Sequence, residues 1–154
     1  MAIFRFRLKT LLNVKVQLEK SAKNELGIAV SFLELQKQEL YILENERKNL
    51  DQDFLLSVSG RIDQEHIQTI KNRILVVEKH RIVQIQKVKE ASDAVDKIRD
   101  RVVILMQERK VLENLKDKEF EQFRIEELHE EQRLADELVT HRSSANREAA
   151  EDIS

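Results

Sequence analysis

Cysteine and proline are absent from the 154-residue sequence, which has only two glycines, Gly27 and Gly60. Without cysteine the chain forms no disulfide framework and no thiolate metal site, which suits a reducing compartment. A compact globular domain of this length needs several chain reversals, and reversals favour Gly, Pro, Asn or Asp. Only one stretch, SVSGRID at residues 57–63, combines such residues. The shortage of turn residues therefore argues against an ordinary compact domain.

Long apolar runs are missing as well. No run approaches the roughly 20 residues of a membrane-spanning helix, which predicts a soluble protein with no direct membrane insertion. Near the N-terminus, Arg5, Arg7 and Lys9 interrupt any apolar segment of the kind that a secretion signal requires. We therefore expect a cytoplasmic protein.

What the sequence does contain is charge, with Asp, Glu, Lys and Arg making up 36% of the residues. This composition is typical of long helices and coiled coils. The pattern predicts an all-α fold, a long two-helix antiparallel coiled-coil hairpin whose second helix is longer than the first. We expect the first helix over about residues 8–56, a turn over about 57–62, the second helix over about 63–140 and a frayed tail over 141–154. Asp63 is placed to cap the second helix, and residues 1–154 form a single elongated domain.

Heptad spacing supports the pairing of these two helices. In the second helix, apolar residues recur every 3.5 residues, which specifies a left-handed supercoil. This seam consists of Ile67, Ile70, Ile74, Val77, Arg81, Gln84, Val88, Ala91, Val95, Ile98, Val102, Leu105, Arg109 and Leu112. In the first helix the seam is expected at Leu8, Leu11, Lys15, Leu18 and Ala22, and again at Leu40, Leu43, Arg47, Leu50 and Phe54. The change of phase between Leu26 and Leu33 predicts a stutter.

Charge is distributed unevenly along the chain. Residues 1–24 contain six Lys or Arg side chains and one acidic residue, Glu19. The second helix is expected to extend past the first from about Leu115, and this overshoot is rich in Glu. Both charged segments fit solvated helix faces. They also fit docking of each segment onto a surface of complementary charge.

Residues for catalysis or metal binding do not converge. The four histidines are spread along the chain at His66, His80, His129 and His141. In LHEEQRL, residues 128–134, the second histidine of a zinc-protease motif is missing, and SVSG lacks the flanking glycines of a nucleophile elbow. The basic stretch from Lys71 to Lys89 lacks aromatic stacking residues and a recognised nucleic-acid-binding module. We expect no enzyme activity, catalytic residue, metal, cofactor or nucleic-acid partner.

Apolar residues outside the seam indicate further contacts. A helix in a two-helix hairpin buries one stripe, so a surplus of apolar residues broadens the packing, mediates self-association or binds another protein. Near the turn the surplus comprises Tyr41, Leu75, Val76, Ile82, Val83 and Ile85, and in the overshoot Phe120, Ile125, Leu128, Leu134 and Leu138. In the overshoot, Phe120, Phe123, Leu128 and Leu134 are expected to have no facing helix.

The N-terminal sequence FRFRLKTLLNVK, residues 4–15, followed by two unequal helices and a Glu-rich tail, resembles the FliJ family of flagellar type III export proteins. The resemblance implies a non-enzymatic coiled-coil hairpin similar to the central stalk of rotary ATPases. Such a stalk fits into the export ATPase hexamer, promotes its assembly or turnover, and links it to the membrane protein of the export gate. Some members also bind export chaperones. The implied location is peripheral, at the inner face of the cell membrane at the flagellar base.

The resemblance also assigns residues to two surfaces. The ATPase-facing end comprises Phe4, Arg5, Phe6, Arg7, Leu8, Leu11, Leu12, Leu112, Leu115, Phe120 and Phe123. The candidates for the gate-facing surface are Tyr41, Ile70, His80 and Val83. Two alternatives remain open. Phe4 and Phe6 could serve only to pack the start of the first helix against the second helix, with the arginines solvated. The protein could also be a self-associating coiled-coil scaffold with no ATPase partner.

Overall fold

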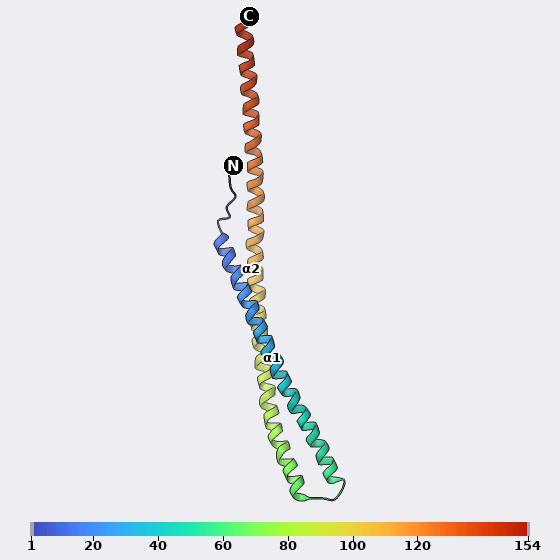
Figure 1. Ribbon diagram of the computed structural model, residues 1–154. Coiled ribbons are helices and arrows are strands. Elements are labelled where there is room, and N and C mark those ends of the chain that lie inside the picture. Colours follow the sequence, from blue (N-terminus) through green and yellow to red (C-terminus); the bar gives the residue numbers. More distant parts are fainter. Residues whose placement is uncertain (1, 154) are drawn as a thin grey trace. The chain divides into compact units, whose positions relative to one another are not determined.

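Two α-helices account for almost all of the computed structural model, which describes residues 2–153 (Figure 1). Helix α1 spans Lys9–Val58 and helix α2 spans Gln64–Ile153, with no strand in the described range. The predicted all-α fold with a longer second helix is confirmed. Residues 141–153, expected as a frayed tail, are helical, and their fraying in solution stays a prediction.

Short-range hydrogen bonds order the turn between the helices. The Ser57 hydroxyl donates to the Asp53 carbonyl oxygen at 2.7 Å, and the Ser59 hydroxyl donates to the Leu56 carbonyl oxygen at 3.1 Å. Asp63 caps α2 as predicted, because its Oδ1 accepts a bond from the Glu65 backbone N–H at 3.1 Å. Gly60 does not have a positive φ, so the turn makes no use of glycine's left-handed freedom.

The chain forms two compact units. Unit 1 comprises Met1–Val16 and Met106–Ser154, and unit 2 comprises Gln17–Leu105. In unit 2, every position of the predicted α2 seam from Ile67 to Leu105 is buried or half-buried. The best-enclosed cluster there contains Ala22, Val102 and Leu105, with Leu26 and Ile98 packed against it.

The seam of α1 is continuous, so the predicted stutter is wrong. Leu18 is 45% exposed and its neighbour Glu19 only 4%, which places the seam one residue later than expected. Likewise, in unit 1, Leu12 is buried and Leu11 is exposed. Steps of three and four residues then continue through unit 2 at Glu19, Ala22, Leu26, Ala29, Leu33, Gln36, Leu40, Leu43, Arg47, Leu50 and Phe54. The sequence favoured the wrong register because it offers leucine at 11 and 18 and a carboxylate at 19.

Polar contacts within unit 2 show that the two helices run antiparallel. Glu25 pairs with Arg101 at 3.1 Å, and Arg47 pairs with Glu78 at 3.0 Å. Between them, the buried Gln84 amide donates to the Gln36 side-chain oxygen at 2.8 Å and to the Gln36 backbone carbonyl at 3.0 Å. Among residues 2–153, every buried side-chain nitrogen or oxygen has a hydrogen-bond partner. The polar residues of the seam are therefore satisfied.

Candidate protein interaction surfaces

A short non-helical segment, residues 2–8, precedes α1 in unit 1, and we call it the N-terminal strap. The Phe4 ring packs edge-on against Phe120, with centroids 5.2 Å apart and planes at 75°, and lies 5.5 Å from the Phe123 ring. Phe6 is buried with Leu12 and Leu112. Successive side chains of an extended segment point to opposite faces. The aromatic residues of the FRFR sequence consequently face α2, while its arginines are exposed.

Ion pairs join the same two parts of unit 1. The Arg7 Nε lies 3.6 Å from the Glu119 Oε1, and the Lys15 Nζ lies 2.6 Å from the Glu108 Oε2. Arg7 is well exposed, so water screens its pair and the pair contributes little to stability. Apolar packing by Phe4 and Phe6 therefore holds the strap.

The residues predicted to face the ATPase divide by burial. Phe6, Leu12 and Leu112 are buried, and Phe4, Leu8, Leu115 and Phe123 are half-buried. Those that remain exposed are Arg5, Arg7, Leu11 and Phe120. Phe120 and Phe123 were expected to have no facing helix, and the contact that they make is with the non-helical strap, since Phe4 lies against both rings. Sequence periodicity missed this contact because the strap is not a helix.

Beyond the strap, α2 continues with its whole circumference exposed. Every described residue from Leu128 to Ile153 is exposed, and we call residues 128–153 the distal segment. Its large apolar side chains are between 50% and 67% exposed, at Leu128, Leu134, Leu138 and Val139. Pairs at helical spacing support it, with Arg133 lying 2.6 Å from Glu130 and 3.3 Å from Glu137. The Arg133 hydrogen bond and charge lower the pKa of the Glu130 carboxyl.

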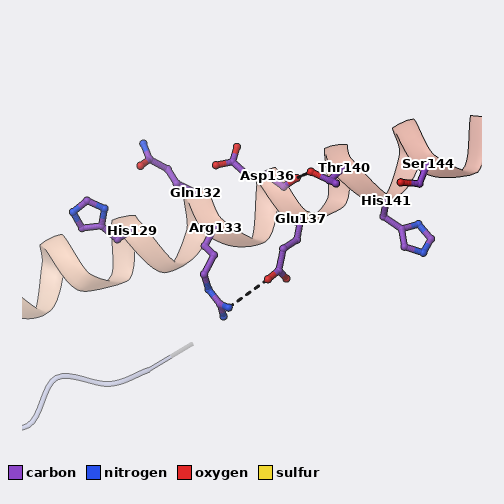
Figure 2. Close-up of a pocket in the computed structure, with 8 residues that line it drawn as sticks. All are labelled: His129, Gln132, Arg133, Asp136, Glu137, Thr140, His141 and Ser144. Carbon is purple, nitrogen blue, oxygen red and sulfur yellow. Dashed lines mark hydrogen bonds and ion pairs between the residues drawn. The ribbon is translucent and has the colours of Figure 1, made fainter. Parts of the chain in front are cut away.

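A shallow depression on the distal segment is lined by side chains of this one helix, and the sticks in Figure 2 radiate from α2 in several directions. They are His129, Gln132, Arg133, Asp136, Glu137, Thr140, His141 and Ser144. His129 and His141 are about three helical turns apart, which prevents them from binding one metal ion. Among residues 2–153, no group of three His, Cys, Asp or Glu side chains could hold a metal. The depression is an open helix face, and it offers no enclosed site.

The predicted gate-facing residues lie in unit 2, and they do not form one surface. Tyr41, His80 and Val83 are exposed. Ile70 is only 5% exposed and lies in the α2 seam, so its assignment to an exposed surface is corrected. His80 and Val83 are three residues apart on one face of α2. Tyr41 belongs to α1.

A groove lies beside His80, between this face of α2 and helix α1. Its lining consists of Glu46, Asn72, Arg73, Val76, Val77 and His80. The Arg73 guanidinium lies 3.6 Å from the Glu46 carboxylate and links α2 to α1 there. Val77 forms the buried floor, while Val76 and His80 are exposed. We call this feature the His80 groove.

A second apolar stripe on α1, which was not among the predicted features, leads to the His80 groove. The exposed residues Ile28, Leu35 and Ile42 recur every seven residues, and Phe32 lies between the first two. Glu46 of the groove follows Ile42 by four residues, so it continues the same face. The seven-residue spacing of these apolar residues could have revealed the stripe in the sequence. The prediction missed it because Leu18, which belongs to this stripe, was assigned to the buried seam.

Within residues 2–153, neither helix is apolar enough over a sufficient length to cross a membrane. A family model described as "Flagellar FliJ protein" matches residues 4–148. No curated protein and no solved structure matches the chain.

Proposed function

Because the chain belongs to the FliJ family, whose members are non-catalytic components of flagellar protein export, we propose that it is a stalk and adaptor of the type III export apparatus. In this role, unit 1 fits into the export ATPase hexamer and promotes its assembly or turnover, and unit 2 contacts the membrane protein of the export gate. Residues 1–154 act as a single domain. The protein works in the cytoplasm, peripherally at the inner face of the cell membrane at the flagellar base, and export chaperones are further partners.

The observation that carries this proposal is the exposed distal segment. An isolated helix with apolar side chains on its surface gains free energy when a partner removes them from water, by roughly 25 cal/mol for each Å² buried. Leu128, Leu134 and Leu138 have no cover among the described residues. The channel of a ring-shaped hexamer would surround a single helix on all sides, which matches exposure around the whole circumference.

The His80 groove supports the contact with the export gate. It combines an apolar floor at Val77 with an imidazole at His80 and a charged pair, Arg73 and Glu46. Binding surfaces commonly combine an apolar centre with a few fixed polar groups. The second stripe at Ile28, Phe32, Leu35 and Ile42 would extend the apolar part of this surface along α1.

The alternative, a self-associating scaffold, would bury the same apolar residues between two copies. Acidic residues outnumber basic ones from Glu113 to Leu138. Two distal segments placed side by side would therefore repel each other. This repulsion favours the stalk over the scaffold.

A fluorescence titration tests the ATPase contact. Because the chain has no cysteine, Leu134→Cys provides one attachment point for an environment-sensitive dye within the distal segment. Adding purified export ATPase hexamer should shift the emission to shorter wavelength, saturably, as water leaves this site. The matched control is Lys48→Cys, an exposed position of α1 in unit 2, whose dye should not respond. An unchanged Leu134→Cys signal would contradict insertion of the distal segment.

A further inference from the structure

The turn between α1 and α2 exposes a cluster of apolar side chains that neither the seam nor the His80 groove uses. The cluster consists of Leu55, Leu56, Val58 and Ile62, which are between 45% and 72% exposed, and we call it the apolar tip. Solvated turns are normally built from Gly, Asn, Asp and Ser. A concentration of exposed apolar groups in a short segment marks an interaction site.

The backbone beneath the apolar tip is held in place by its own hydrogen bonds. The Ser57 and Ser59 hydroxyls donate to the carbonyl oxygens of Asp53 and Leu56, near the end of α1, and Asp63 caps α2. The Lys71 ammonium lies 6.0 Å from the centre of the Phe54 ring, at the base of the turn. The apolar side chains therefore project from an ordered turn, which lowers the entropy cost of docking.

Charges close to the apolar tip restrict what can cover it. The stretch from residue 51 to 65 carries four carboxylates against one cation, Arg61. Asp51 is paired with Arg47 at 3.1 Å, which leaves Asp53, Asp63 and Glu65 as the excess. An anionic bilayer surface would repel this excess of negative charge. A second copy of the same tip would bring like charges together, which also opposes association. An apolar socket with a basic rim satisfies both the apolar groups and the carboxylates.

We propose that the apolar tip is a docking element that enters an apolar socket, rimmed by Lys or Arg, on another protein of the export apparatus. The socket covers Leu55, Leu56 and Ile62, and its rim faces Asp53 and Glu65. This contact is additional to those of the distal segment and the His80 groove. It depends on the proposed function only in that its partner belongs to the export apparatus.

The test uses a flagellated strain that lacks the gene and receives the full-length chain or a variant of it. The variant Leu55→Ser, Leu56→Ser, Ile62→Ser removes the apolar groups. The matched control, Gln52→Ser, Gln64→Ser, His66→Ser, changes three exposed polar residues of the same region. Because all six side chains are exposed, both purified variants should keep the helix content of the wild type. We expect the tip variant to reduce export of flagellar substrates at least about tenfold, as removal of a central apolar anchor does, while the control exports normally.

The other possible results of these experiments would each contradict a different part of the proposal. A folded tip variant that exports as well as the wild type would overturn the docking proposal and leave the proposed function standing. If deletion of the whole gene does not affect export, the proposed function fails together with the tip. Cosedimentation of the wild type, and not of the tip variant, with vesicles of phosphatidylcholine and phosphatidylglycerol would assign the tip to a membrane instead. A dimer in light scattering that the tip variant abolishes would assign it to a second copy.

Discussion

Phe4 makes the contact that distinguishes the N-terminal strap from a loose terminus. Its ring contacts both Phe120 and Phe123, and aromatic pairs of this kind contribute about 0.5 to 1.5 kcal/mol beyond their buried area. Phe4→Ala should lower the free energy of unfolding by about 1 to 2 kcal/mol and accelerate hydrogen exchange at residues 112–123. Arg5→Ala, which changes an exposed neighbour, is the control. Unchanged exchange in Phe4→Ala would show that the strap does not hold α2.

Gly27 lies within α1 without a structural need for glycine. Its φ is not positive, it is exposed, and an added Cβ would meet no atom within 4 Å. Gly27→Ala should raise the free energy of unfolding by about 0.5 to 1 kcal/mol, because alanine has less backbone entropy to lose on folding. Urea denaturation measures this change. A decrease in stability would contradict the regular helix described at this position.

Gln36 and Gln84 form the buried polar pair of the unit 2 seam. Gln84→Leu alone leaves the Gln36 side-chain oxygen without its donor, which should cost about 1 to 3 kcal/mol. Changing both residues to Leu should recover most of that loss, because the unpaired polar group is then gone. The double variant should also form more dimers in light scattering, since a buried polar pair restricts the pairing of coiled coils. If the double variant is as unstable as the single one, the pair is not the source of the cost.

At the scale of the helices, ion pairs along the surface of the distal segment add a small contribution to its helical state. The hydrogen bond from Arg133 lowers the pKa of the Glu130 carboxyl below its ordinary value of 4.5. The helical state therefore gains from the ionised carboxylate above pH 4.5 and loses this gain as the pH falls through the lowered pKa. NMR chemical shifts of residues 128–140 should report loss of helix in this range, and the effect should be small because the pair is exposed. Arg133→Gln should weaken this pH response, and an equal response in both proteins would contradict the role of the pair.

The two helices and their pairing were predictable because their signals are local or periodic. The α2 seam follows from repeats such as Ile70, Val77 and Gln84, and the Asp63 cap follows from its position before a helix. The register of α1 was misjudged because the burial of Glu19 depends on tertiary packing, which its local ion pair with Lys23 at 3.1 Å, four residues along the same helix, does not reveal. The packing of Phe4 on Phe120 was also out of reach, since no periodic rule connects a non-helical segment to a distant helix.

At the scale of the whole molecule, the two units present separate surfaces. Unit 1 provides the strap and the distal segment, while unit 2 provides the His80 groove, the second stripe and the apolar tip. This separation suits an adaptor, because partners that bind different units do not compete for the same residues. The structure of the strap also shows that part of the N-terminal FRFR sequence serves to pack the chain itself. Its phenylalanines pack within the chain, whereas Arg5, Arg7 and Leu11 are exposed.

The turnover rate of a purified export ATPase, measured with increasing amounts of this protein, tests the central claim most directly. The comparison is between the full chain and a chain that ends at Glu127, which keeps the strap contacts and lacks the distal segment. The full chain should increase ATP hydrolysis to a saturating level, and the shortened chain should not. Equal stimulation by both chains, or none by either, would contradict the proposal that the distal segment of a non-enzymatic stalk acts within the ATPase ring.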